Sequence, residues 1–322
     1  MKRFTIAPLV SVLCLLVPLD VLAQAFPIKP VRVIVPFTPG GGADIQARLL
    51  SQKLQEIWGQ SVLIEHKPGA ATIIGTDAVA KAAPNGYTMG AVFGSYTINP
   101  SLRSDMPFDT LKDLSGVSMF TVTPLVITAT NSLPANNVTE LIALAKTNAG
   151  KLTYATPGNG TTMHLAGELF KSLTGTSILH IPYKGSAQAY PDVIAGRVSL
   201  QIDTLHASST NIKTGKVKGI AFTSLRREPS SPDIPTVAEI LPEFKAEAVS
   251  GIVVPSATPR DVVHKISADI NKALKSPDLV AHLKQQGMEP AGTTPEQFDA
   301  FIRSEIEKWG KVVKFSGAKA AD

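Results

Sequence analysis

The sequence predicts an α/β protein of two domains, and three observations support this prediction. Short β-branched runs alternate with helical patterns almost throughout the chain, which is the rhythm of parallel sheets built from β-α-β units. This rhythm starts twice, each time with a Thr-Pro-Gly turn after a strand. The chain has 322 residues, more than one hydrophobic core usually serves. We therefore expect two α/β domains with a ligand cleft between them.

The first unit opens with a predicted strand over 31–37 and a helix that follows it directly. The apolar residues of this helix recur at three- and four-residue spacing up to a stop at Gly59 and are Ile45, Leu49, Leu50, Leu54 and Ile57. The unit continues with a strand over 61–65, a helix near 74–81 and a strand over 87–93.

The second unit repeats the order with strands over 151–155, 178–181 and 198–203 and helices over about 162–173 and 187–195. Apolar strands at 123–126 and 250–253 join the two units and form a two-strand hinge. The C-terminal helices, 259–274 and 295–313, then return to the first domain. The expected division is 26–124 plus 252–322 for the first domain and 125–251 for the second.

Glycine turns occupy matching places in the two units. Thr38-Pro39-Gly40-Gly41-Gly42 is repeated as Thr156-Pro157-Gly158-Asn159-Gly160, each between a strand and a helix. The second strand of each unit ends in a similar turn, at Gly69-Ala70 and at Gly185-Ser186. A strand that turns into a helix through glycine presents free backbone N–H groups and the positive end of the helix dipole. Ligands of parallel sheets bind at the carboxyl ends of strands, so four such turns predict an anion site.

The first 25 residues have the pattern of a cleavable secretory signal, with Lys2 and Arg3 before a short apolar run and a small-residue end at Ala23-Gln24-Ala25. We expect cleavage after Ala25 and a periplasmic mature protein. Cys14 is the single cysteine and lies inside the signal, so disulfides, thiolate catalysis and cysteine metal sites are excluded from the mature chain. The net charge of +5 comes without a dense basic stripe, which argues against nucleic acid.

Two kinds of enzyme compete with a binding protein. The glycine turn followed by Glu65 at the end of the second strand suggests a nicotinamide-dependent oxidoreductase, but the third glycine of the dinucleotide fingerprint is absent. A hydrolase would need a G-x-S-x-G elbow or an H-E-x-x-H helix, and neither is present. His164 and Glu168 share one helix face but make no zinc site alone. We expect no catalytic residues, no cofactor and no metal.

Six segments together resemble the extracytoplasmic solute receptors of tripartite tricarboxylate transporters, also called Bug receptors. They are PGGGADIQARLLSQKL, KPGA with IGTDAVAKAAPNGYT, HLAGELF, PYKGSAQA, DIPTVAEI and EIEKWGKVVK. The resemblance implies a periplasmic binding protein of the Venus flytrap type that captures a small carboxylate and delivers it to a membrane permease. It is expected to act as a monomer. The family pattern has a glycine pair where Ala71 and Thr72 stand, and Gly-Ser where Gly160 and Thr161 stand.

The resemblance and the turns point to the same candidate ligand-binding residues. They are Pro39, Gly40, Gly41, Gly42, Asp44, Gly69, Ala70, Ala71, Thr72, Tyr96, Gly158, Asn159, Gly160, Thr161, Thr162, His164, Lys184, Gly185, Ser186 and Asp203.

Several of these candidates have a structural alternative. Thr161 and Thr162 are also placed to cap a helix, and Asp44 is expected to do so. His164 and Tyr96 can equally be packed residues. Lys184 can pair with a carboxylate or be solvated, and Asp203 can bind a ligand amine, orient a loop or cap a helix.

Overall fold

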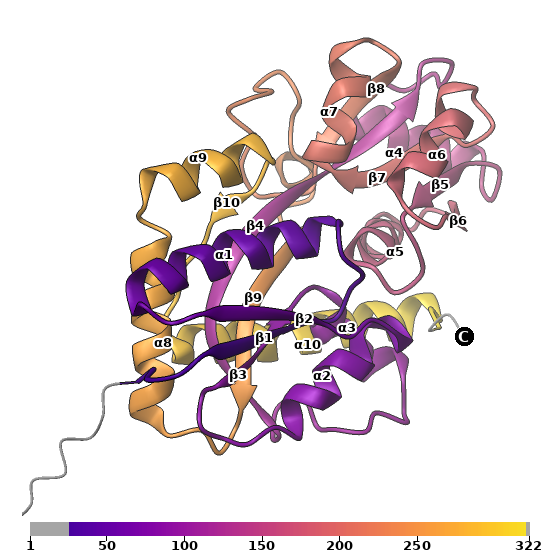
Figure 1. Ribbon diagram of the computed structural model, residues 1–322. Coiled ribbons are helices and arrows are strands. Elements are labelled where there is room, and N and C mark those ends of the chain that lie inside the picture. The colour runs from indigo at the N-terminus through magenta and orange to yellow at the C-terminus, as the bar shows by residue number, and fades with distance from the viewer. Residues whose placement is uncertain (1–25, 320–322) are drawn as a thin grey trace, which may run out of the picture.

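The computed structural model describes residues 26–319 and confirms an α/β protein with two lobes (Figure 1). The predicted signal over residues 1–25 lies outside the described residues. The sheet of the first lobe contains β1 (Val31–Val35), β2 (Val62–His66), β3 (Thr88–Val92), β9 (Glu247–Pro255) and β10 (Glu289–Pro290). The sheet of the second lobe contains β5 (Thr153–Thr156), β6 (Leu179–Pro182), β7 (Leu200–Thr204) and β8 (Val217–Phe222).

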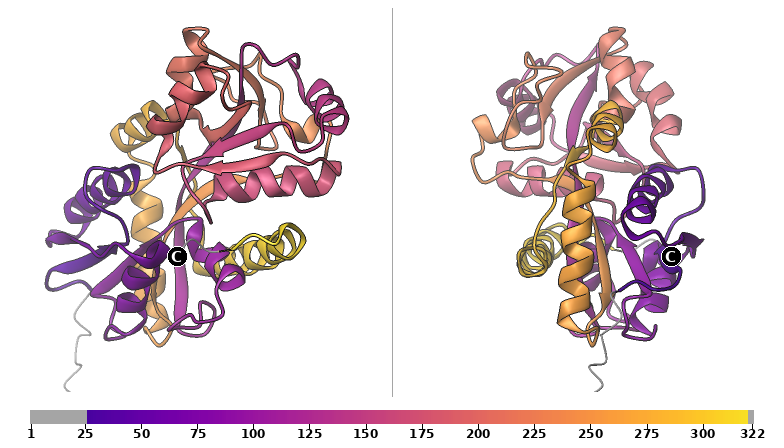
Figure 2. Two further views of the ribbon diagram at one scale, coloured as in Figure 1. Left: turned by 90° about the vertical axis from the view of Figure 1, so that its right-hand side faces the viewer. Right: turned by 60° about the vertical axis from the view of Figure 1, so that its left-hand side comes forward.

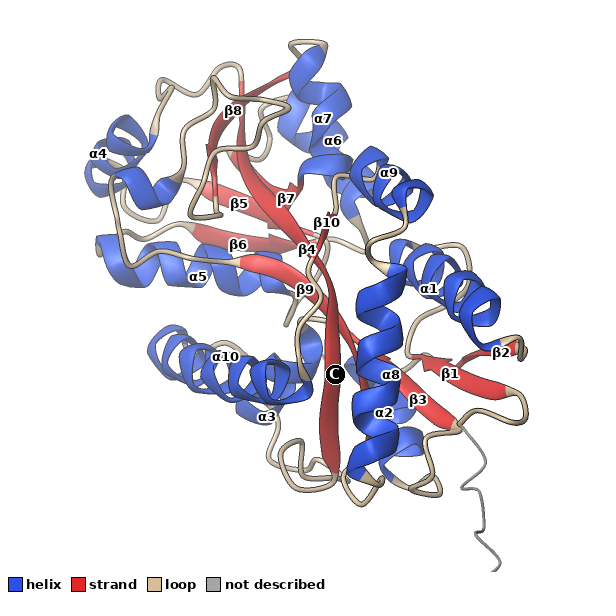
Figure 3. Cartoon of the chain, turned by 90° about the vertical axis from the view of Figure 1, so that its left-hand side faces the viewer, coloured by secondary structure: helices blue, strands red, loops and turns tan. Residues whose placement is uncertain are grey.

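One long strand, β4 (Leu114–Thr130), belongs to both sheets (Figure 3). From Leu114 to Pro124 it pairs antiparallel with β9, and from Leu125 onward it pairs antiparallel with β7 and β8. In the first lobe β1 pairs parallel with β2 and β3, and in the second lobe β5 pairs parallel with β6 and β7. The two lobes are therefore connected through strands β4 and β9.

Ten α-helices are present among residues 26–319. In the first lobe lie α1 (Gly42–Trp58), α2 (Ile73–Ala80), α3 (Ser95–Leu102), α8 (Arg260–Ala273), α9 (Pro277–Gln285) and α10 (Pro295–Ser316). In the second lobe lie α4 (Val138–Thr147), α5 (Thr162–Thr174), α6 (Ser186–Ile194) and α7 (Leu205–Lys213). Short 3₁₀ turns occupy Ala70–Thr72 and Val237–Glu239. Every strand and helix that the sequence predicts in the β-α-β units is confirmed, with ends that shift by at most two residues.

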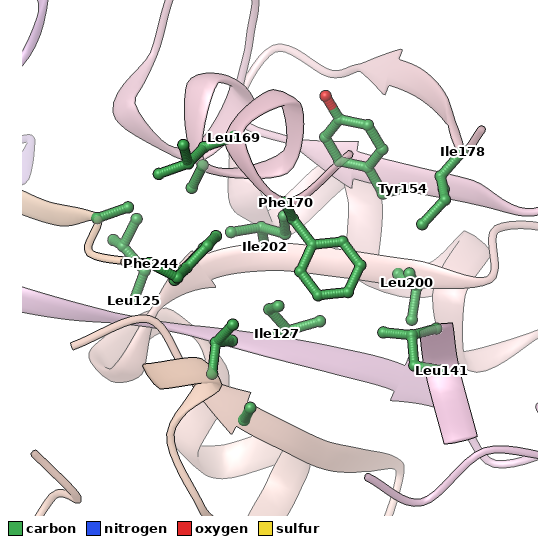
Figure 4. Close-up of a cluster of buried hydrophobic side chains, with 14 of the residues drawn as sticks. Leu125, Ile127, Leu141, Tyr154, Leu169, Phe170, Ile178, Leu200, Ile202 and Phe244 are labelled. Atoms are coloured by element: carbon green, nitrogen blue, oxygen red, sulfur yellow. The ribbon is translucent and has the colours of Figure 1, made fainter. Parts of the chain in front are cut away.

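The second lobe has its own core, in which side chains of α5 fill the space above β4 and β7 (Figure 4). Phe170 of α5 meets Phe244 edge to face, with ring centroids 6.3 Å apart. Leu125, Ile127 and Ile202 supply the β-sheet side of this core and are each at most 3 % exposed. Aromatic and aliphatic side chains pack densely in this arrangement, which holds α5 against the sheet.

Helix α10 contacts the cores of both lobes. Phe298 and Ile302 in its first half pack into the first lobe, whereas Trp309 and Val312 in its second half pack into the core that contains Tyr154. Figure 2 and Figure 3 show α10 beneath α5. The helix begins with a capping box between Thr294 and Gln297. A third connection between the lobes therefore accompanies β4 and β9.

No helix within residues 26–319 is both long enough and apolar enough to span a bilayer.

Candidate functional site

The first glycine turn joins β1 to α1 and leaves backbone donors open. Gly40 has φ +86, a conformation that residues with a side chain rarely adopt, and Gly41 is the N-cap of α1 without a side-chain capping bond. A Cβ atom built on Gly40, Gly41 or Gly42 meets no heavy atom within 4 Å. Among the described residues, none accepts a hydrogen bond from the N–H of Gly41 or Gly42. The turn thus combines N–H groups without an acceptor in the described part of the chain, open space around its glycines and a helix N-terminus, as an anion site requires.

Asp44 closes this turn from behind. Its side chain is 6 % exposed and accepts hydrogen bonds from the Gly40 N–H at 2.9 Å and from Arg48 Nε at 3.0 Å. His66 Nε2 lies 2.8 Å from its other oxygen. Burial alone would raise the pKa of Asp44, but these hydrogen bonds outweigh burial and lower the pKa to about 2. The carboxylate is thus fully occupied by the protein, in keeping with the expected capping role.

The second turn of the first lobe is strained. After Gly69, the residues Ala70, Ala71 and Thr72 follow one another with φ values of +46, +51 and +82. Helix α3 holds this turn, because Asn99 Nδ2 donates to the Ala71 carbonyl at 2.8 Å and the hydroxyls of Thr72 and Ser95 lie 3.0 Å apart. Within residues 26–319 no acceptor faces the N–H groups of Ala70 and Ala71. Backbone strain of this kind clusters at functional sites.

The glycine turn of the second lobe leads from β5 into α5. Gly160 has φ +68, and its N–H donates to His164 Nδ1 at 3.1 Å. Thr161 is the N-cap of α5, and its hydroxyl donates to the Gly158 carbonyl at 2.8 Å and accepts from the His164 N–H at 3.2 Å. For the part of the chain that the structure describes, the N–H groups of Thr161 and Thr162 have no protein acceptor.

The fourth turn adjoins the third. The Gly185 N–H donates to the Pro157 carbonyl at 3.2 Å, which ties the start of α6 to the preceding glycine turn. Asp203, which is 1 % exposed, accepts from Gln201 Nε2 and from the Thr204 N–H, both at 2.8 Å, and from the Ser186 hydroxyl. Burial raises the pKa of Asp203 despite these bonds. Asp203 thus orients the neighbouring loop, whereas Lys184 is exposed.

The lobes meet where α3 and α5 begin. A Cβ atom on Gly94 would lie 2.0 Å from Thr162 Oγ1, and one on Gly160 would lie 3.0 Å from Leu102. A small pocket at this junction takes its lining from both lobes, including Phe93, Gly94 and Thr162. Helix α3 therefore lies between the two turns: its Asn99 holds Ala71 of the first lobe, and its Leu102 lies beside Gly160 of the second. The Phe37 ring, before the first glycine turn, meets Phe93 edge to face at 5.2 Å.

Tyr96 is a packed residue with one edge at this pocket. It is 4 % exposed, its hydroxyl donates to the Thr110 carbonyl at 3.1 Å, and burial raises its pKa strongly. The sequence did not predict α3 or its neighbours Gly94, Ser95 and Asn99 as parts of the site. Gly94 follows a strand, as the predicted turn glycines do, but Pro100 inside the next segment argues against a helix.

Two acids that the enzyme hypotheses singled out, Glu65 and Glu168, pair with other side chains. Glu65, the candidate ribose-binding acid, pairs with Arg32 at 3.0 Å and with Lys67 at 2.8 Å. Glu168 accepts from the Tyr154 hydroxyl at 2.6 Å and pairs with Lys171 at 2.8 Å. Within the described residues, no group of three or more His, Cys, Asp or Glu side chains is placed to hold a metal ion.

Three comparisons with known proteins bear on the family and the fold. A family model described as "Tripartite tricarboxylate transporter family receptor" matches residues 46–318. Protein BugT of Bordetella pertussis is 37 % identical over 93 % of this chain and 93 % of BugT. The structure of Rhodopseudomonas palustris Rpa4515 with adipate has a TM-score of 0.78 and 33 % identity, covering 91 % of this chain and 99 % of that one. MatC of the same organism, with bound malate, has a TM-score of 0.74 and 28 % identity, covering 89 % and 100 %.

Proposed function

Because the chain belongs to the family of tripartite tricarboxylate transporter receptors, we propose that it binds a small carboxylate between its lobes and presents it to a transporter permease. The protein is an extracytoplasmic solute receptor of the periplasmic binding protein type. Export through a signal cleaved after Ala25 and release into the periplasm are part of the proposal. The proposal also divides the chain into a first domain, 26–124 plus 252–322, and a second domain, 125–251. It assigns the protein no catalytic activity.

One observation supports the ligand class most directly: each glycine turn presents two N–H groups at the start of its helix that have no acceptor among residues 26–319. Gly41 and Gly42 supply them in the first lobe, and Thr161 and Thr162 supply them in the second. Carboxylate oxygens accept several such bonds, and helix N-termini favour negative charge. Adipate and malate in two similar proteins are carboxylates as well.

The remaining predicted residues enter the proposal by their position. Ala70 and Ala71 offer further free N–H groups in the first lobe, and Ser186 does so beside Asp203 in the second. Asp44, His164 and Tyr96 act through the backbone that they hold rather than by touching the ligand. Backbone donors of this kind recognise a carboxylate group in general, so the shape of the pocket selects among acids.

A thermal-shift and calorimetric screen of the mature chain tests the proposal. The panel contains malate, adipate, other di- and tricarboxylates and acidic amino acids, with the dimethyl esters of malate and adipate as uncharged controls. A ligand present at a hundred times its Kd adds about 2.7 kcal/mol to the free energy of unfolding. At least one acid should stabilise the protein while its ester does not. A panel without any stabilising acid, or with equal effects of acid and ester, would contradict the proposal.

Gly41→Val provides the matched variant for this screen. The backbone at Gly41 has φ −85, which valine adopts readily, and the space around a Cβ atom there is open. The side chain would fill the space in front of the free N–H groups, so binding should be lost while the fold is kept. Gly160→Val is a poorer test, because φ +68 and the nearby Leu102 would strain the fold itself.

A further inference from the structure

The two glycine turns share a hydrogen bond from a glycine N–H to a side chain, a feature that the proposed function does not itself require. In each lobe a glycine with positive φ, Gly40 or Gly160, donates its N–H to the side chain four residues later. The acceptor is a carboxylate oxygen of Asp44 at 2.9 Å in the first lobe and the imidazole Nδ1 of His164 at 3.1 Å in the second. Each bond restrains a glycine, Gly40 or Gly160, whose backbone would otherwise have wide conformational freedom.

The imidazole of His164 is supported from the adjoining strand. Its ring stacks on that of His180 with centroids 4.0 Å apart and an interplanar angle of 14°. His180 Nε2 lies 2.7 Å from the hydroxyl of Thr156, the last residue of β5. The ring pair therefore connects Thr156, at the end of the strand before the glycine turn, with His164, which accepts from the Gly160 N–H.

The two acceptors differ in their response to acid. Asp44 stays an ionised carboxylate acceptor at any pH above about 2, where its carboxyl protonates. His164 can accept from Gly160 only while Nδ1 is unprotonated, because a protonated imidazole has donors alone. The titratable groups around the ring are Glu168 and Lys171 on α5, His180 on β6 and Tyr154 on β5. A groove lined by His164, His180, Glu168 and Lys171 opens this cluster toward solvent.

We propose that Asp44 and His164 are matched positioning residues that hold the two glycine turns open to the ligand, and that protonation of His164 releases the turn of the second lobe alone. A proton on Nδ1 would face the Gly160 N–H, so donor would meet donor and the bond would break. The Gly40 turn would be unaffected over the same range of pH. The role in ligand binding rests on the function proposed above, whereas the state of the turn can be measured without any ligand.

Hydrogen exchange of single amides, followed by NMR and corrected for intrinsic rates, tests the proposal. His164→Leu removes the acceptor, and loss of one such bond should speed exchange of the Gly160 amide roughly three- to tenfold. His164→Asp gives the second lobe a carboxylate acceptor like Asp44 of the first lobe, so the Gly160 amide should stay protected. Burial lowers the pKa of His164 from its usual value, so protection of Gly160 in the wild type should fall only well below neutral pH, whereas it should persist in His164→Asp. The Gly40 amide serves as internal reference.

His264→Leu is the matched control, because it removes a half-exposed histidine on α8, away from the turns. Equal Gly160 exchange in folded wild type and His164→Leu, or wild-type protection that survives acid, would overturn the proposal. In a second arm, calorimetry with malate and adipate should show wild-type affinity falling toward acid pH and that of His164→Asp falling less. If neither acid binds, the proposed binding of these two carboxylates is contradicted. The exchange data still show whether His164 holds the Gly160 turn.

Discussion

Gly94 and Thr162 lie at the closest approach of the two lobes beside the candidate site. Gly94→Ala would place a methyl group 2.0 Å from Thr162 Oγ1, an overlap that a shift of one lobe or a rotation of the Thr162 side chain must relieve. We expect the variant to fold with little loss of stability, because the overlap lies between lobes. Its affinity for any carboxylate that binds the wild type should drop at least about tenfold in calorimetry, which is about 1.4 kcal/mol.

A double-mutant cycle shows whether this loss arises from the contact. In Thr162→Ala the hydroxyl is absent, and the nearest remaining side-chain atom, Cβ, lies 3.4 Å from the added methyl group. Gly94→Ala should therefore cost much less affinity in the Thr162→Ala background than in the wild type. Equal costs in both backgrounds would show that Gly94 matters for another reason.

The stacked histidines predict a loss of stability in acid. Burial, the neighbouring His164 and Lys171 lower the pKa of His180 to about 3 from its usual 6.5. The folded protein keeps this ring neutral while the unfolded chain protonates it, so unfolding takes up a proton below about pH 6.5. The free energy of unfolding should fall by about 1.4 kcal/mol per pH unit from there toward pH 3 for this residue alone.

Denaturant titrations at several pH values check this slope. His180→Gln keeps a polar group for Thr156 but cannot titrate, so its stability should depend less on pH over this range. The half-exposed His264, changed to Gln, supplies the control and should leave the slope as it is in the wild type. A His180→Gln variant with the wild-type slope would argue against a neutral buried ring.

The backbone of the turn before α2 is strained, and hydrogen bonds from α3 stabilise it in this conformation. Ala71 is exposed and has φ +51, which costs about 1–2 kcal/mol relative to glycine. Glycine at this position would lose about 0.4–1 kcal/mol through the greater freedom of the unfolded chain. Ala71→Gly should therefore raise the free energy of unfolding by about 0.5–1 kcal/mol in denaturant titrations.

Ala143→Gly on α4 is the reference for this prediction. Ala143 is exposed in an ordinary helical conformation, where glycine lowers stability by about 1 kcal/mol. Opposite signs for the two variants are expected. If Ala71→Gly destabilises the protein as Ala143→Gly does, the turn is not strained in solution.

Local pattern was enough to predict the parallel strands and their helices, because each carries a run of β-branched residues or a helical period of its own. It was not enough for β4, of which only the stretch 123–126 was predicted as a strand, because the full element Leu114–Thr130 depends on pairing with β9 and β7. Helix α3 was missed since Pro100 weakens its local signal and tertiary contacts to α10 stabilise it. The positive φ values of Ala70 to Thr72 depend on Asn99 and Ser95, which are distant in sequence.

At the scale of the whole molecule, the glycine turns were predictable because glycine marks both of them, whereas the meeting of the lobes was not. The contact between Gly94 and Thr162 joins residues from the two lobes, and the sequence of neither segment alone indicates it. The same holds for α10, whose first half packs in one core and whose second half packs in the other.

The lobes are linked by β4, β9 and α10, so we expect hinge closure on ligand binding. The open form should predominate without ligand, and a ligand shifts this equilibrium by its differential affinity for the closed form. Small-angle scattering should give a smaller radius of gyration after a binding acid is added, with its dimethyl ester as the control. An unchanged curve with a tightly bound acid would mean that the lobes do not move or are closed when empty.

The most direct test of carboxylate capture by backbone donors is a crystal structure of the mature chain with the acid that the screen selects. The carboxylate oxygens should lie at hydrogen-bond distance, about 2.7–3.2 Å, from N–H groups of Gly41 or Gly42 in one lobe and of Thr161 or Thr162 in the other, directly or through one water. A carboxylate held by lysine or arginine side chains, or bound outside the junction of the two lobes, would contradict the account.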